Sequence, residues 1–184
     1  MKEKRTMPRP DFRPQNIQEA YEKAAVSALN KMGAMLRTVV STELRTHYNI
    51  KKQDLDKYIR VVKATRGHYE ISLMIANQQL PLILFDPIQT KEGVSVEEIK
   101  GKRITIKHLF IAPRKIGSLM NIGTDDVFKR RTKKRLPLIE ATGPNIADLA
   151  RSKRISAAIK KAYDEEFATL LSHEFSYYYS HMRQ

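Results

Sequence analysis

Apolar side chains recur at helical spacing near the start of the chain. Positions three or four residues apart form one stripe: Ile17, Tyr21, Ala24, Ala28, Met32, Met35 and Val39. The stripe predicts an amphipathic helix from Asn16 to about His47, because residues at such spacing share one face. Asn16 is the predicted N-cap, and Glu19 completes a capping box. Gly33 inside this helix costs about 1 kcal/mol relative to alanine, which indicates close packing or a bend.

A second helical pattern lies at the other end of the chain. Its apolar side consists of Ile155, Ile159, Ala162, Tyr163, Phe167, Leu170 and Leu171. The pattern predicts a C-terminal helix. Near its end lies the aromatic run Tyr177, Tyr178 and Tyr179, which we expect to dock on the protein's own core or on a neighbouring subunit. Stacking on nucleic-acid bases is the alternative.

Between these helices the period of the pattern changes to two. Residues 69–75 alternate between apolar and polar side chains and predict a half-buried strand. Residues 59–64 predict a weaker strand, and Thr65-Arg66-Gly67-His68 is the predicted hairpin loop between them. Residues 49–58 predict a turn and a short helix.

Further short strands are predicted in the second half of the chain. The apolar run from Leu80 to Phe85 contains Pro81, which belongs at a sheet edge or a strand start. Residues 94–98 and 102–111 predict a second hairpin, with Ile104 and Ile106 facing inward. Residues 113–124 predict an exposed loop, 127–131 a short strand and 136–139 an extended run. Thr142-Gly143-Pro144 predicts a break that leads into helix.

Helices at both ends and strands between them predict an α+β fold. We expect a long N-terminal helix and a C-terminal helix packed on a small, mainly antiparallel β-sheet. The 184 residues are expected to form a single domain over 16–184. Residues 1–15 contain three prolines among lysines and arginines, and are predicted to be a flexible basic arm.

Composition removes several classes of protein from consideration. The chain has no cysteine, which excludes disulfides and thiolate metal sites. The first residues lack the apolar segment of a signal peptide. No apolar run approaches the roughly 20 residues that span a bilayer, so no membrane partner is predicted.

The net charge of +14 is unevenly distributed. Residues 100–135 hold twelve lysines and arginines against two aspartates, a net charge of +10, which leaves +4 for the rest of the chain. Residues 129–135 alone place six cations in seven positions. Such a field favours a polyanion or an acidic protein surface as a partner. The alternative is a solvated basic face that only aids solubility.

No catalytic, cofactor-binding or metal site is predicted. The segment from Gly117 to Gly123 lacks the spacing of a phosphate-binding loop, and the five histidines are scattered. Ser172-His173-Glu174 is interpreted as helix surface, because neighbours on a helix point in different directions. We therefore expect that the protein is not an enzyme. A hydrolase or nuclease is a further alternative, which lacks a visible carboxylate–histidine cluster.

Several short motifs follow one another in an order that resembles a known family. They are Ala28-Leu29-Asn30, Arg37-Thr38, His47-Tyr48-Asn49-Ile50, Leu80-Pro81-Leu82-Ile83-Leu84-Phe85, Gly101-Lys102, His108-Leu109-Phe110-Ile111-Ala112, Val127-Phe128-Lys129-Arg130, Arg135-Leu136-Pro137-Leu138-Ile139 and Gly143-Pro144-Asn145-Ile146. Over residues 17–171 this set resembles the minor tail protein Z family of lambda-like phages and prophages, the tail-completion proteins. The dense cations of 129–135 and the proline arm depart from the family pattern.

The resemblance implies a structural component of a long-tailed phage virion. Such a protein would complete the tail at its head-proximal end, near the head–tail junction, and help to position the genome end. Its expected partners are the tail tube, the tail terminator and the end of the genome DNA. Tail symmetry adds the expectation of a homo-oligomeric ring of six copies. The expected location is the virion tail near the neck, and the host cytoplasm during assembly.

The same resemblance assigns structural roles to Phe85, Phe110 and Phe128 as core anchors of the sheet. Gly143 and Pro144 would set the turn into the C-terminal helical region, and Pro137 belongs to the Leu-Pro-Leu motif. The predicted partner or DNA contacts are the basic residues Lys102, Arg103, Arg114, Lys115, Arg130, Arg131, Lys133, Lys134 and Arg135. Arg130 has two open interpretations, a carboxylate of a neighbouring subunit or DNA. The alternative function is a sequence-nonspecific nucleic-acid-binding protein without an assembly role.

Overall fold

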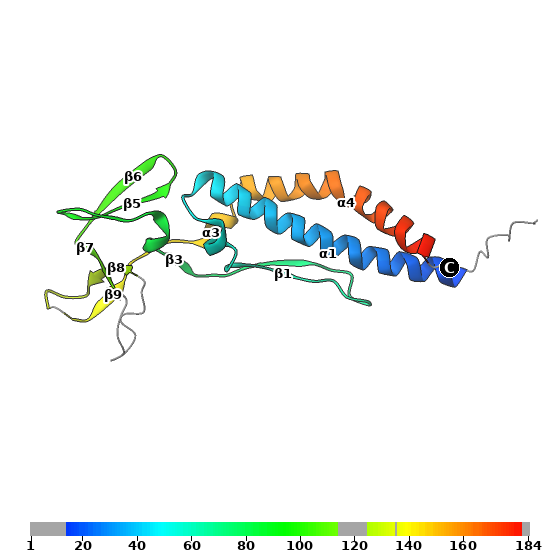
Figure 1. Cartoon of the computed structure of the whole chain (residues 1–184), viewed down its shortest axis with the longest axis horizontal. Helices are drawn as coiled ribbons and strands as arrows, with labels where there is room; N and C mark the ends of the chain where they lie inside the picture. Colours follow the sequence, from blue (N-terminus) through cyan, green and yellow to red (C-terminus); the bar gives the residue numbers. More distant parts are fainter. Residues whose placement is uncertain (1–13, 114–124, 135, 182–184) are drawn as a thin grey trace, which may run out of the picture.

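Two long antiparallel helices form one side of the molecule, and small β-sheets extend from them (Figure 1). The structure is a computed structural model that describes residues 14–113, 125–134 and 136–181. Helix α1 spans Pro14–His47 and helix α4 spans Lys153–His181. The start of α1 lies beside the end of α4. This arrangement confirms the predicted α+β class.

One buried stripe on α1 explains how the helices pack. Its members recur every four residues and are at most 8% exposed: Ala20, Ala24, Ala28, Met32, Leu36, Val40 and Leu44. The first three are alanines, whose small side chains allow α4 to approach closely. A four-residue step turns about 40° around the helix, so the stripe changes direction along α1. Its last members, Val40 and Leu44, belong to the core that α1 shares with the strands.

The strands are short and pair antiparallel in four small sheets within the described residues. Their bounds are β1 Ile59–Val62, β2 Ser72–Ile75, β3 Gln79–Pro81, β4 Ile88–Gln89, β5 Gly93–Ile99, β6 Lys102–Lys107, β7 Leu109–Pro113, β8 Asp125–Arg130, β9 Leu138–Glu140 and β10 Thr142–Asn145. The sheet orders are β1-β2, β10-β3, β4-β5-β6 and β7-β8-β9. Short helices α2 (Lys52–Leu55), η1 (Leu82–Phe85) and α3 (Ile146–Ala150) connect them.

The β1–β2 hairpin packs directly on α1. The Asn30 side chain donates to the Ala64 carbonyl at 3.1 Å and accepts from the Ala64 N–H at 2.8 Å. Next to it, a Cβ on Gly33 would lie 2.7 Å from Cγ1 of Val61. Gly33 therefore marks close packing, one of the two predicted alternatives. The Thr65–His68 loop is confirmed by two backbone hydrogen bonds of 3.0 Å.

Replacing Gly33 by alanine is expected to destabilise the protein by about 1–3 kcal/mol, although alanine is the better helix former. The added methyl group meets Val61, a β-branched side chain with little rotameric freedom. Urea unfolding of the variant measures the loss. The control measures the same Gly33→Ala change in a Val61→Ala background. There the loss of stability should be smaller, because the methyl groups of Val61 are absent. Equal losses in both backgrounds would contradict the contact.

Several local predictions are wrong in detail. Helix α1 begins at Pro14, so Asn16 is inside it and is not its N-cap. Proline suits the first helical position, where its missing N–H has no intrahelical partner. The predicted arm of 1–15 therefore overlaps α1, and residues 1–13 lie outside the described residues. The single predicted sheet is instead four small ones.

The second predicted hairpin also differs from the structure. The strand breaks at His108, whose φ of 64° is left-handed, so β6 and β7 join different sheets. Ile104 is 41% exposed and is not buried as expected, because β6 is the edge strand of its sheet and Ile104 has a neighbouring strand on one side only. Ile106 is half-buried against the core. Gly143 and Pro144 are part of strand β10, and it is Asn145 that caps α3 by accepting from the Ala147 N–H at 2.9 Å.

Candidate anion-binding groove

A basic groove forms where β6 gives way to β7 and the end of β8 lies alongside. Its volume is about 630 Å³. The lining combines two short segments: Ile106, Lys107, His108 and Leu109 from one, and Lys129, Arg130, Thr132 and Lys133 from the other. Leu109 pairs with Lys129 in the antiparallel β7–β8 register, which brings these segments together. The positively charged side chains of the groove are therefore brought together by strand pairing as well as by their proximity in the sequence.

The charges in this groove are weakly compensated. Lys107 faces Glu92 at 3.8 Å, but both side chains are 71% exposed, so this pair is screened by water. Within the described residues the side chains of Lys129 and Lys133 form no ion pair. The Arg130 guanidinium lies over the Phe110 ring, 5.2 Å from its centroid. The groove can bind an anion through these two lysines, which have no competing carboxylate among the residues that the structure describes.

The predicted contact residues do not form one surface. Arg131, Lys133 and Lys134 are exposed in the turn after β8. Arg114, Lys115 and Arg135 lie outside the described residues.

Arg103 lies at the other end of β6 and has partners. It forms ion pairs with Asp86 and Glu97 and also donates to the Asp86 and Ser95 carbonyls. Arg103 therefore links β6 to β5 and to Asp86, which precedes β4. Its role as a partner or DNA contact stays a prediction. Its neighbour Lys102 is exposed beside the hairpin turn.

The three phenylalanines of the motifs have different environments. Phe85 is completely buried, but it belongs to the 3-10 helix η1 and not to a strand. Phe110 and Phe128 are a cross-strand pair with ring centroids 6.4 Å apart, and both are half-buried. They line an open pocket of about 850 Å³ together with Pro137. Phe110 and Phe128 are therefore not core anchors, because this face of the β7–β8–β9 sheet lacks a covering layer among the described residues.

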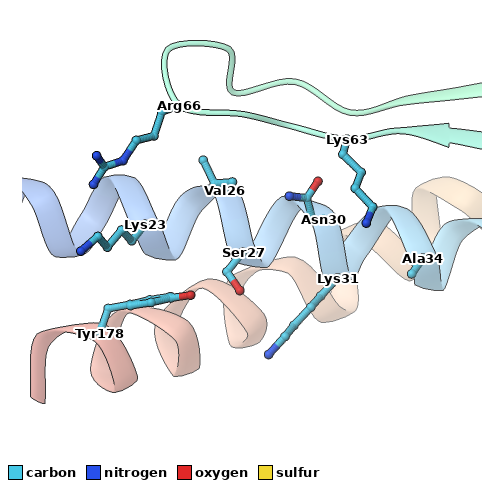
Figure 2. Close-up of a pocket in the computed structure, with 9 residues that line it drawn as sticks. All are labelled: Lys23, Val26, Ser27, Asn30, Lys31, Ala34, Lys63, Arg66 and Tyr178. Atoms are coloured by element: carbon cyan, nitrogen blue, oxygen red, sulfur yellow. The ribbon is translucent and has the colours of Figure 1, made fainter. Parts of the chain in front are cut away.

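A second basic pocket was missed by the sequence analysis. It has a volume of about 730 Å³ and lies between α1, the β1–β2 hairpin and the end of α4 (Figure 2). Its cations are Lys23 and Lys31 of α1, with Lys63 and Arg66 of the hairpin. In the sequence, this pocket is indicated only by the four-residue spacing of Lys23, Ser27 and Lys31, which places the three side chains on one face of a helix.

Glu174 joins α4 to α1 beside this pocket. It is 3% exposed, so its interpretation as helix surface is wrong, whereas Ser172 and His173 are exposed. Its carboxylate accepts from Lys31 Nζ at 2.5 Å and from Ser27 Oγ at 2.6 Å. The hydrogen bonds from Lys31 and Ser27 lower the pKa of Glu174 to about 2. The carboxylate is therefore charged at neutral pH and fixes the position of Lys31.

Within residues 14–113, 125–134 and 136–181, no helix is long and apolar enough to cross a membrane. No group of three or more His, Asp or Glu side chains there is arranged to hold a metal ion.

Comparisons with known proteins give no relative: no family model, no curated protein and no solved structure matches this chain. The tail-completion family therefore stays a prediction from the ordered motifs.

Proposed function

We propose that this protein is a structural component of a long-tailed phage virion, which completes the tail near the head–tail junction and helps to position the genome end. The observation that carries this proposal is the spatial convergence of the motifs. Several segments that carry the resemblance lie up to about 60 positions apart in the chain. In the structure these segments contact one another or the residues next to them.

The pairing can be followed in the backbone hydrogen bonds. The His47–Ile50 segment joins the end of β5 through Asn49 N–H to Glu98 O at 3.1 Å and Lys100 N–H to His47 O at 2.9 Å. Leu82 of η1 donates to the Ala141 carbonyl at 3.1 Å, next to the Leu-Pro-Leu-Ile motif. Phe110 and Phe128 of two further motifs are direct cross-strand partners. A set of motifs that forms one packing unit supports a shared structural origin better than scattered matches would.

The basic groove borders this unit, which supports an anionic partner at the same end of the molecule. In a tail protein the partner would be an acidic surface of a neighbouring subunit or the phosphates of the genome end. Six copies in a ring would place six such grooves around one axis.

The alternative is a nonspecific nucleic-acid-binding protein without an assembly role. Lys129 and Lys133 favour it, because they form no ion pair with any residue that the structure describes and nonspecific binding rests on lysine and arginine contacts to phosphates. The two functions predict different results in an assembly experiment.

The test is charge reversal of the exposed turn, Arg131→Glu with Lys133→Glu and Lys134→Glu. We expect the variant to fold, because all three side chains are exposed, but to fail to join tails in an assembly reaction. The readouts are thermal unfolding, co-sedimentation with tail-tube and terminator subunits, and particle imaging. The control reverses Lys51, Lys91 and Lys153, three exposed lysines elsewhere with the same total change in charge.

Wild-type protein that stays monomeric and binds no tail component would overturn the tail proposal. If it nevertheless bound DNA in a salt-dependent manner, the result would favour the alternative function.

A further inference from the structure

We infer that the pocket between α1 and the β1–β2 hairpin is a second anion site, which binds successive phosphates of a nucleic-acid backbone. The inference goes beyond the proposed function, because this pocket is formed by other elements than the basic groove and lies outside the basic segment of residues 100–135. Figure 2 shows Lys63 and Arg66 extending from the hairpin over α1, with Lys23 and Lys31 on the helix beneath them.

The backbone that carries the hairpin cations is held rigidly. Both polar atoms of the Asn30 side chain bond to the backbone of Ala64, the residue after Lys63. Two hydrogen bonds between Thr65 and His68 close the turn that presents Arg66. Positions fixed in this way reduce the conformational entropy that is lost when a ligand binds.

The charge in and around the pocket is positive even after its internal pairs are counted. Four cations face two carboxylates, since Glu174 holds Lys31 and Glu19 is shared by Lys23 and Arg66. The side chain of Lys63 forms no ion pair or hydrogen bond within the described residues. A net positive charge of two is left for a ligand.

Glu19 occupies the place that an external anion would take. It lies 3.0 Å from Lys23 Nζ and 3.3 Å from an Arg66 guanidinium nitrogen. Hydrogen bonding to Lys23, and next to Arg66, lowers the pKa of Glu19. All three side chains are at least 38% exposed, so a phosphate can compete with this carboxylate for both cations.

The spacing of the cations favours a polyphosphate chain over a single phosphate. Lys23 and Lys31 are eight residues apart on α1, which corresponds to about 12 Å along the helix axis. One phosphate cannot contact both ends of such a row, whereas successive backbone phosphates can. The apolar side chains of Val26 and Ala34 complete the lining without adding negative charge.

The experiment measures binding of the full chain to a fluorescein-labelled DNA duplex of mixed sequence, by anisotropy over a range of salt concentrations. The double variant Lys63→Gln with Arg66→Gln neutralises the hairpin cations. The magnitude of the slope of log K against log salt should fall by about 1.8, because each lost phosphate contact contributes about 0.9. Affinity at 0.1 M salt should fall at least tenfold, roughly. The matched control, Lys153→Gln with Lys160→Gln, removes the same charge from exposed positions of α4 and should change neither value.

A second variant separates binding from structure. Glu19→Gln should raise DNA affinity roughly threefold, because the internal competitor for Lys23 and Arg66 is removed. A purely structural role of this ion-pair cluster predicts no gain. Inorganic phosphate at matched ionic strength should not displace the duplex, whereas a site for one phosphate would be blocked by it.

An unchanged salt slope in the hairpin variant would overturn the inference. The inference would also be overturned if the hairpin variant bound DNA as the wild type does but no longer bound an acidic tail subunit. That result would assign the surface to a protein partner. Failure of the tail assignment is detected separately, by the assembly experiment on the turn after β8.

Discussion

Replacing Phe85 by alanine is expected to lower the free energy of unfolding by roughly 3–5 kcal/mol, the range for removing a buried aromatic ring. Phe85 has no exposed surface and belongs to the core with Leu80, Val94 and Val96. A Cβ placed on Gly143 would be 3.2 Å from the Phe85 ring, so the strand β10 backbone lies directly against it. The cavity would open between the segments that carry the family resemblance, where neither η1 nor β10 can move without breaking hydrogen bonds.

Urea unfolding followed in parallel by far-UV and near-UV circular dichroism measures this effect. Far-UV signal comes mainly from α1 and α4, whereas near-UV signal also includes Tyr48 and Tyr58, which pack against the core that contains Phe85. If the β unit loosens first, the two transitions separate, which breaks two-state behaviour. The control is Leu136→Ala, a side chain that is 66% exposed in the same region and should cost less than about 0.5 kcal/mol. Equal losses in both variants would contradict the role of Phe85 as an anchor.

The predictable parts of this fold are those with long, regular patterns. The α1 stripe was predicted in part: Ala24, Ala28 and Met32 are buried as expected, whereas Ile17 and Tyr21 are 36% and 53% exposed. The buried face turns along α1, so Leu36, Val40 and Leu44 are buried in place of Met35 and Val39. The β1–β2 hairpin was predicted because Ile71, Leu73 and Ile75 alternate with polar or exposed neighbours, and these three are half-buried as expected. The predicted strand of 69–75 is too long, because β2 begins at Ser72 and Tyr69 is 46% exposed. Such patterns are local, so they require no knowledge of which elements meet.

Short apolar runs were less informative. Residues 82–85 form a 3-10 helix, although the run resembles a buried strand, since four residues are too few to reveal a period. Ile104 has a strand-like alternation but lies on an edge strand, and only the order β4-β5-β6 reveals this. Sheet order is a non-local property, which the pattern along one strand does not contain.

The candidate sites show the same difference: a local run of charge can be predicted from the sequence, whereas a contact between distant elements cannot. The charge of residues 129–135 was evident from counting, and five of those cations are exposed at the groove or in the turn beside it: Lys129, Arg130, Arg131, Lys133 and Lys134. The second pocket was missed because Lys63 and Arg66 meet α1 only after the hairpin packs on Asn30 and Gly33. The position of Glu174 did have a signal. It follows Phe167, Leu170 and Leu171 at spacings of seven, four and three, which places it on the inner face of α4.

Glu174 is expected to make the stability of the folded protein fall as pH falls from about 5 toward 2. The folded-state pKa of about 2 lies below the ordinary value of 4.5, so the unfolded chain binds more protons between these values. The stabilisation is complete above the unfolded pKa and is lost as pH decreases through the folded pKa. The shift corresponds to about 2–3 kcal/mol, because Glu174 is buried but its partner Lys31 is half exposed and screened by water.

The variant Glu174→Gln isolates this contribution. At pH 7 it should be less stable than wild type by about 2–3 kcal/mol, and the difference should shrink toward zero near pH 2. Urea unfolding at several pH values gives both curves, with Glu166→Gln as a control that removes an exposed carboxylate from the same helix. Other carboxylates titrate in wild type and variant alike, so they cancel in the difference.

Lys31→Gln then identifies the cause. Lys31 donates the hydrogen bond that lowers the pKa of Glu174 most, so its removal should reduce the effect of Glu174→Gln in a double-mutant cycle. A stability difference that does not vary between pH 2 and 7 would mean that Glu174 acts through its shape rather than its charge. In that case the contact between α1 and α4 would rest on apolar packing and on the contacts of Tyr21 with Phe175 and of Arg154 with Glu43.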